Sequence, residues 1–123
     1  LTAMAGHHKN ELERLRNAFG YSMYGLGAAF RLEGAFRAEV LLACILIPLA
    51  FYVSDEALTR AVLIGSMLIV MVTELLNSAV EAAVDRISTE HHELAKRAKD
   101  IGSAAVFVSL VNLAVVWILI AFT

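Results

Sequence analysis

Hydrophobic positions gather along the chain into three long apolar segments, which predict three membrane-spanning helices. The segments cover about 35–53, about 57–86 and about 101–122. About 20 residues of helix are enough to cross the hydrocarbon core of a bilayer. The third segment carries no charged residue, whereas Glu74 interrupts the second and Pro48 is expected to kink the first or to mark irregular packing. The pattern predicts an all-α membrane protein.

A different pattern precedes the first span, at about 9–30. Leu12, Leu15 and Phe19 share one face of a helix, and polar or charged positions occupy much of the remainder. A helix with this pattern lies along a membrane surface. Glycines in the second half of this stretch would allow a bend before the first span. These glycines are Gly20, Gly25 and Gly27.

Composition and charge fit this interpretation and set the orientation. Hydrophobic residues make up 59% of the 123 positions, against roughly 45–50% in soluble domains, so the chain has the size and character of one small membrane domain. Cations cluster before the first span and between the second and third, which predicts that both regions are cytoplasmic and that the C-terminus is outside. The net charge of −2 and the lack of a dense basic stripe argue against nucleic acid as a partner.

The second segment carries several acids on one helical face. At about 100° per residue, Glu81 and Asp85 lie about 20° to either side of Glu74, and Asn77 and Ser78 share the same stripe. Acids inside a spanning helix are costly, and neighbouring carboxylates repel each other, so the stripe needs a metal ion, a cation or water. A polar seam that only joins helices is the alternative interpretation.

The connection after this stripe, STEHHELAKRAKD (88–100), brings several cations to the place where the stripe ends. Carboxylate oxygens bind Mg²⁺, which keeps phosphate ligands, and cations stabilise a transferring phosphoryl group, so the pattern is compatible with a phosphate substrate bridged by Mg²⁺. Taken alone, the basic residues are better explained as a topology signal with lipid headgroup contacts. Adjacent His91 and His92 cannot easily face one ion, which disfavours zinc. Since GxxxxGK[ST] and the protein-kinase signatures are absent, nucleotide chemistry would need another scaffold.

Two motifs, ELLNSAVEAAVDR and HELAKRAKDIGSAAV, together with GYSMYGLGAAFRLEGAFRAE, resemble the bacterial integral-membrane diacylglycerol kinases. The resemblance covers the chain from about residue 14 to the C-terminus. It implies a homotrimer in the bacterial inner membrane, each subunit with a surface helix and three spanning helices. It also implies Mg²⁺-dependent transfer of the ATP γ-phosphate to diacylglycerol, giving phosphatidic acid in phospholipid recycling. One chain of three spans is too small to enclose both ATP and a lipid, so a composite site between subunits is expected on geometry.

The resemblance implies roles for individual residues. Glu74 matches the general base that takes the proton from the lipid hydroxyl, and Glu33 and Glu81 match the two metal-binding glutamates. Besides these two glutamates, the positions that match contacts to ATP are Arg14, Tyr21, Glu90, His91, His92, Lys99 and Asp100. Besides Glu74, the positions that match contacts to the lipid substrate or support the base are Arg14, Ala35, Glu39, Arg60, Asn77 and Ser103.

The chain departs from the family's pattern in the surface helix. Met23 and Tyr24 stand where an aromatic and a basic residue are usual, and Gly27 stands where an arginine is usual. These positions would touch lipid or shape the helix, so the departures bear on lipid affinity more than on the chemistry.

Three other functions are compatible with parts of the pattern. Related kinases of Gram-positive bacteria phosphorylate undecaprenol and resemble this chain over the stripe from Glu74 to Asp85. A small proton-coupled transporter could use Glu74, although transport sites usually lie at the bilayer midplane and these acids lie towards the cytoplasmic end. A purely structural membrane module would tolerate neutralisation of all three acids.

Overall fold

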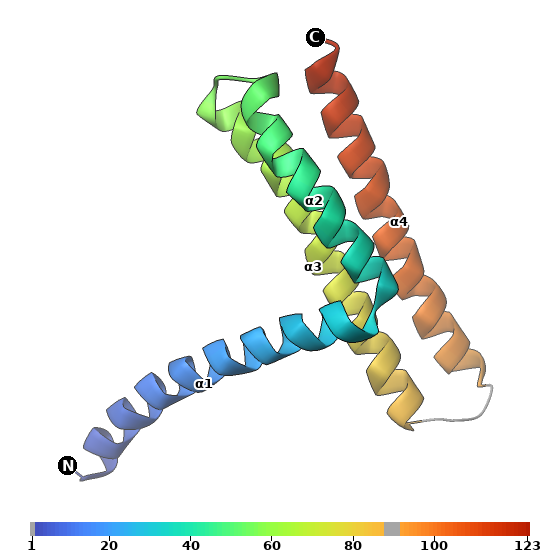
Figure 1. The fold of residues 1–123 in the computed structure, drawn as a ribbon. Coiled ribbons are helices and arrows are strands. Elements are labelled where there is room, and N and C mark those ends of the chain that lie inside the picture. Colours follow the sequence, from blue (N-terminus) through green and yellow to red (C-terminus); the bar gives the residue numbers. More distant parts are fainter. Residues whose placement is uncertain (1, 88–91) are drawn as a thin grey trace.

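In a computed structural model, residues 2–87 and 92–123 are described, and they form four helices (Figure 1). The helices are α1 (Thr2–Leu32), α2 (Gly34–Val53), α3 (Ala57–Ile87) and α4 (Glu93–Ala121). By length and composition, α2, α3 and α4 could each cross a membrane. The all-helical class is therefore confirmed, together with three helices that are long and apolar enough to span a membrane.

The three candidate spans lie side by side, and α1 projects from them as a long arm (Figure 1). Both α2 and α4 pack against α3, and α4 does so more extensively, so α3 is the central helix. The C-terminus lies at the same end of the bundle as the turn between α2 and α3. At the opposite end, which we call the basal end, α3 stops at Ile87 and α4 starts at Glu93.

The bend between α1 and α2 occurs at Glu33 and not at the glycines, so the predicted place of the bend is wrong. The helix α1 runs without interruption through Gly20, Gly25 and Gly27. A glycine in a helix costs about 1 kcal/mol relative to alanine, which weakens a helix without breaking it. Glu33 instead has extended backbone angles, φ −113° and ψ 107°.

Arg37, in the first turns of α2, fastens this corner. Its Nη1 donates to the carbonyl oxygens of Phe30 and Arg31, at 2.9 Å in both cases. These carbonyls belong to the last turn of α1, where backbone acceptors have no partner within the helix. The guanidinium group therefore completes the end of α1 from the start of α2, and it holds Glu33 at the break.

The core is formed mainly by one face of α3. Leu63, Met67 and Val70 are fully buried at the three- and four-residue spacing of a helical stripe. Ala43 of α2 and Leu113 of α4 pack in one cluster with Met67 and Val70. Most other large apolar side chains on the three spans are exposed, which gives the bundle an outer surface compatible with lipid.

Two polar contacts fasten the bundle away from the basal end. Trp117 Nε1 of α4 donates to Ser66 Oγ of α3 at 3.2 Å, and that hydroxyl in turn donates to the carbonyl of Leu63 at 2.6 Å. At the turn between α2 and α3, Arg60 donates to the carbonyls of Ser54, at 2.7 Å, and Phe51, at 3.2 Å. The Trp117–Ser66 contact satisfies two polar groups between apolar helices, whereas the Arg60 contacts complete the end of α2 at a polar turn.

Candidate active site

The structure brings together four of the predicted acidic residues. Glu74 of α3 and Glu39 of α2 are buried, with 6% and 8% of their surfaces exposed. Glu74 interacts electrostatically with Glu39, Glu81 and Glu33. The site therefore combines the central helix, the start of α2 and the corner at the end of α1.

Asn77 lies one turn after Glu74 and is also buried, with 9% of its surface exposed. Its Nδ2 donates to Glu81 Oε1 at 3.4 Å. Its Oδ1 is buried without a hydrogen-bond partner in the described part of the chain, and so is Glu39 Oε2. Since most buried polar atoms are hydrogen-bonded, these two acceptors leave capacity for water, an ion or a ligand at the acids.

Lys99 of α4 reaches across to the acidic stripe of α3. Its Nζ lies 2.6 Å from Asp85 Oδ1, and it also interacts electrostatically with Glu81. Lys99 was predicted from the family motif, but no role was predicted for Asp85 beyond its place in the stripe. The pair joins the basal ends of α3 and α4, and it holds a cation beside the carboxylates.

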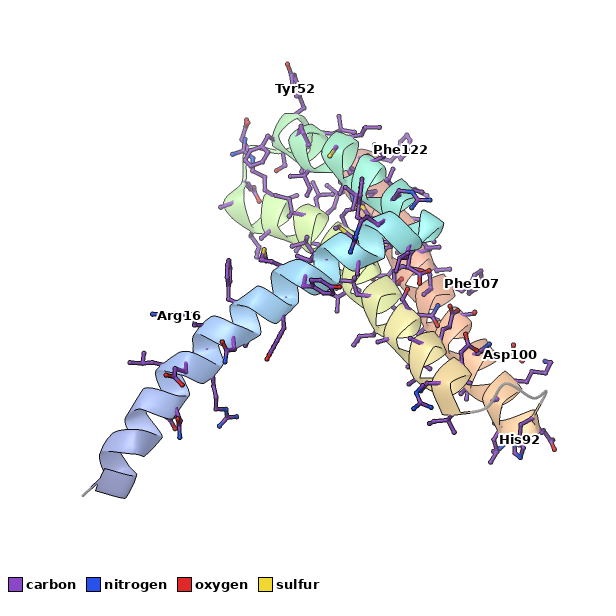
Figure 2. The ribbon with its side chains drawn as sticks, turned by 60° about the horizontal axis from the view of Figure 1, so that its bottom comes forward. Arg16, Tyr52, His92, Asp100, Phe107 and Phe122 are labelled. Carbon is purple, nitrogen blue, oxygen red and sulfur yellow. The ribbon has the colours of Figure 1, made fainter. Side chains whose placement is uncertain are left out.

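The other predicted nucleotide contacts on α4 lie at the same end. Asp100 pairs with Lys96 Nζ at 2.7 Å. His92 caps the helix, because its Nδ1 accepts from the backbone N–H of Leu94 at 3.1 Å. Figure 2 shows His92 and Asp100 near the start of α4, at the opposite end of the bundle from Tyr52 and Phe122. Two predicted contacts lie outside the described residues: Glu90 and His91.

The arm α1 carries two predicted contacts that one chain does not bring to its own acids. Arg14 and Tyr21 are exposed on α1. At about 1.5 Å per residue, Arg14 is about 28 Å along the helix from Glu33. The arm leads away from the bundle, as Arg16 illustrates in Figure 2. By contrast, Ala35 follows Glu33 closely, in the first turn of α2.

The remaining predicted positions fall at different ends of the bundle. Ser103 follows Gly102 on α4, and the backbone of Gly102 packs against the side chain of Asn77. Arg60 lies in the first turn of α3, at the far end of the bundle and about 21 Å along α3 from Glu74. Ser103 is exposed at the level of α4 where Gly102 meets Asn77, and Arg60 lies far from the acids along α3.

A groove of about 540 Å³ runs between the last turns of α1 and the face of α3 that follows Glu74. Its lining is mostly apolar and contains small side chains such as Ala79. Ser22, Glu33 and Ser78 provide its polar edge. The groove therefore leads from an apolar surface to the carboxylate at the corner.

The carboxylates fit a magnesium ion that arrives with a nucleotide. In residues 10–87 and 92–123, no group of three or more His, Cys, Asp or Glu side chains is placed to hold a metal ion without help. Mg²⁺ usually takes only one or two carboxylates from a protein and completes its shell with phosphates and water. Glu33 and Glu81 both act electrostatically on Glu74, so two carboxylates of the type that Mg²⁺ accepts lie near it.

Comparison with known proteins assigns the family. The model for prokaryotic diacylglycerol kinase matches residues 20–121. The chain is 54% identical over 106 residues to the diacylglycerol kinase of Haemophilus influenzae, covering 86% of this chain and 90% of the relative. It is 53% identical over 106 residues to that of Pseudomonas aeruginosa, covering 86% of each, and 46% identical over 104 residues to that of Escherichia coli K12, covering 85% of each. The family predicted from the motifs is confirmed, and the chain belongs to the prokaryotic diacylglycerol kinases.

Proposed function

We propose that the protein transfers the γ-phosphate of ATP to diacylglycerol, with Mg²⁺, and so produces phosphatidic acid for phospholipid recycling. The observation that carries this proposal is the position of Glu74, which is buried between α2 and α3 and interacts with both Glu33 and Glu81. The relatives named diacylglycerol kinase support the choice of acceptor.

The length of α3 explains how one site could serve an oily acceptor and a soluble donor. Its 31 residues extend about 46 Å, whereas a hydrocarbon core is about 30 Å thick. With Ala57 at the outer edge of the core, Glu74 falls near the inner edge and Glu81 lies beyond it. The hydroxyl of a diacylglycerol sits at that edge, and ATP reaches it from the cytoplasm.

In the reaction we propose, the Glu74 carboxylate accepts the proton of the lipid hydroxyl as that oxygen attacks the γ-phosphorus of ATP. The bond between the γ-phosphorus and the bridging oxygen breaks, and ADP leaves with that oxygen. Glu33 and Glu81 would hold Mg²⁺, which neutralises charge on the phosphates when it is bound. Lys99, which stands beside Glu81, provides a further positive charge to the transferring group.

The groove between α1 and α3 is the place where we expect the acceptor to bind. Its mostly apolar lining favours an oily molecule over a sugar or an amino acid, and Ser78 and Glu33 mark the end where a hydroxyl would lie. These features favour a lipid kinase over a transporter, because the polar groups face a groove at one end of the bundle. Diacylglycerol is preferred to undecaprenol because of the relatives' names.

The arm supports a composite site in a homotrimer. Arg14, which matches a nucleotide contact, stands about 28 Å along α1 from Glu33 and so too far to reach the acids of its own chain, and Tyr21 is about 18 Å from Glu33 and exposed. Leu12, Leu15 and Phe19 are at least 66% exposed and form an uncovered apolar face. We propose that α1 lies on the cytoplasmic face of the bacterial inner membrane and brings its polar face to the acids of another copy. The C-terminus is then periplasmic.

The decisive experiment measures phosphate transfer from labelled ATP by purified protein in mixed micelles, with and without Mg²⁺. Diacylglycerol and undecaprenol are offered separately. We expect Glu74→Gln to abolish transfer to diacylglycerol while nucleotide affinity stays within about twofold, because the amide cannot take the proton. Glu56→Gln, in the exposed turn at the far end, is the matched control. Transfer only to undecaprenol, or undiminished transfer by Glu74→Gln, would contradict the proposal.

A further inference from the structure

We propose that Gly102 is a positioning residue of this site, because the absence of a side chain there lets the Asn77 amide lie between α3 and α4 and hold Glu81. The inference rests on the proposed function, in which Glu81 binds the metal ion that accompanies ATP. It gives α4 a role in positioning Glu81, one of the two proposed metal-binding glutamates. This role is additional to the nucleotide contacts predicted for Lys99 and Asp100.

The first observation is steric. A Cβ atom added at Gly102 would lie 2.1 Å from Asn77 Oδ1 and 3.2 Å from Asn77 Cγ. Side-chain carbons do not approach other heavy atoms this closely without displacing them. Gly65, on α3, has nothing within 4 Å of the corresponding position. The space restriction is therefore a property of residue 102 and not of glycines in these spans generally.

The second observation is the orientation of the amide. Asn77 Nδ2 donates to Glu81 Oε1, and Oδ1 is buried with no hydrogen-bond partner in the described part of the chain. Reversing the amide would point its oxygen at the carboxylate, where two acceptors repel each other. The NH₂ group must therefore face Glu81, and the oxygen must occupy the space in front of Gly102.

A side chain at position 102 would disturb the site in one of two ways. It could rotate the Asn77 amide, which breaks the hydrogen bond to Glu81. It could instead push α4 away from α3, which lengthens the 2.6 Å contact between Lys99 Nζ and Asp85 Oδ1. Either change leaves Glu81 less well placed for a metal ion, although the rest of the α3–α4 interface remains.

The test measures binding of Mn²⁺ with a non-hydrolysable ATP analogue to the full-length protein in micelles, by electron paramagnetic resonance. Hydrogen bonds to charged groups contribute enough that we expect Gly102→Ala to weaken binding roughly tenfold. Gly65→Ala is the control and should stay within about twofold. Asn77→Ala should also weaken binding roughly tenfold, and adding Gly102→Ala to it should cause little further loss, because both changes remove the same hydrogen bond.

Additive losses in the double variant, or Gly102→Ala binding as tightly as Gly65→Ala, would overturn the inference. If Gly102→Ala does not fold, the double variant Gly102→Ala with Asn77→Ser is expected to fold, because the serine removes the amide oxygen in front of residue 102. Failure of the double variant to fold would also overturn the inference. Phosphate transfer by the unmodified protein is measured on the same preparation. If the unmodified protein transfers no phosphate, the proposed function is refuted. If it is active and Gly102→Ala binds Mn²⁺ with the ATP analogue as tightly as the unmodified protein, only the role of Gly102 is refuted.

Discussion

Replacing Arg60 with alanine is expected to lower the free energy of unfolding by about 2 kcal/mol. The side chain donates two hydrogen bonds to carbonyls of Phe51 and Ser54 at the end of α2, each worth about 0.5–1.5 kcal/mol net. The guanidinium carbon also lies 4.8 Å from the centre of the Phe51 ring, which adds about 0.5 kcal/mol at an exposed site. The 3.6 Å ion pair with the fully exposed Asp55 adds little.

Arg60→Lys separates the contribution of charge from that of geometry. A lysine keeps the positive charge, but its single ammonium group reaches only one of the two carbonyls, so we expect a loss of about 1 kcal/mol. Unfolding is followed by far-ultraviolet circular dichroism during titration of the micelle-bound protein with a denaturing detergent. Equal stability of the lysine variant and the unmodified protein would refute the importance of the two-carbonyl contact.

The same variants decide between two roles for Arg60. The family motif implies a contact with the lipid substrate, whereas the structure places Arg60 about 21 Å along α3 from Glu74. We therefore expect the KM for diacylglycerol to stay within about twofold in Arg60→Ala, provided that kinetics are measured where the protein is fully folded. A tenfold rise in KM would favour the lipid contact.

Three further changes test the packing and the charge pair. Met67→Ala should lower the free energy of unfolding by about 2–4 kcal/mol in the same titration, because the side chain is fully buried in the core; a loss below 1 kcal/mol would contradict this packing. Trp117→Phe should lower it by only about 0.6–1 kcal/mol, because the Ser66 hydroxyl keeps its other hydrogen bond; a loss above 2 kcal/mol would show that the indole contributes mainly by packing. Asp85→Asn should raise the KM for ATP several-fold and leave that for diacylglycerol unchanged, because Lys99 loses the partner that holds it at 2.6 Å. An unchanged KM for ATP would show that Lys99 needs no such partner.

The sequence alone predicted the features that depend on local periodicity. The spans at about 35–53 and 57–86 agree closely with α2 and α3, because apolar stretches bounded by a polar turn define both. The helix that corresponds to the third predicted span, α4, starts earlier than predicted, at Glu93 rather than about 101. Hydropathy marks only the part of a helix that crosses lipid, and the polar first turns of α4 are helical too.

Features that depend on how helices pack could not be predicted in the same way. The place of the bend was wrong because glycine permits a bend without requiring one, while Arg37 bonds the carbonyls that end α1. The pairing of Lys99 with Asp85 and the contact of Gly102 with Asn77 depend on the rotation of α4 about its axis. Shared membership of the acidic stripe was the one signal that pointed to Asp85.

The single-residue corner at Glu33 fixes the rotational phase of α1 relative to the bundle. Adding or removing one residue there would turn the whole arm by about 100°, so that Leu12, Leu15 and Phe19 would face a different direction. An insertion before Asn10 would leave that phase unchanged. A change of length before Asn10 is therefore compatible with this geometry, whereas a one-residue change between Phe30 and Phe36 would rotate α1 relative to the bundle.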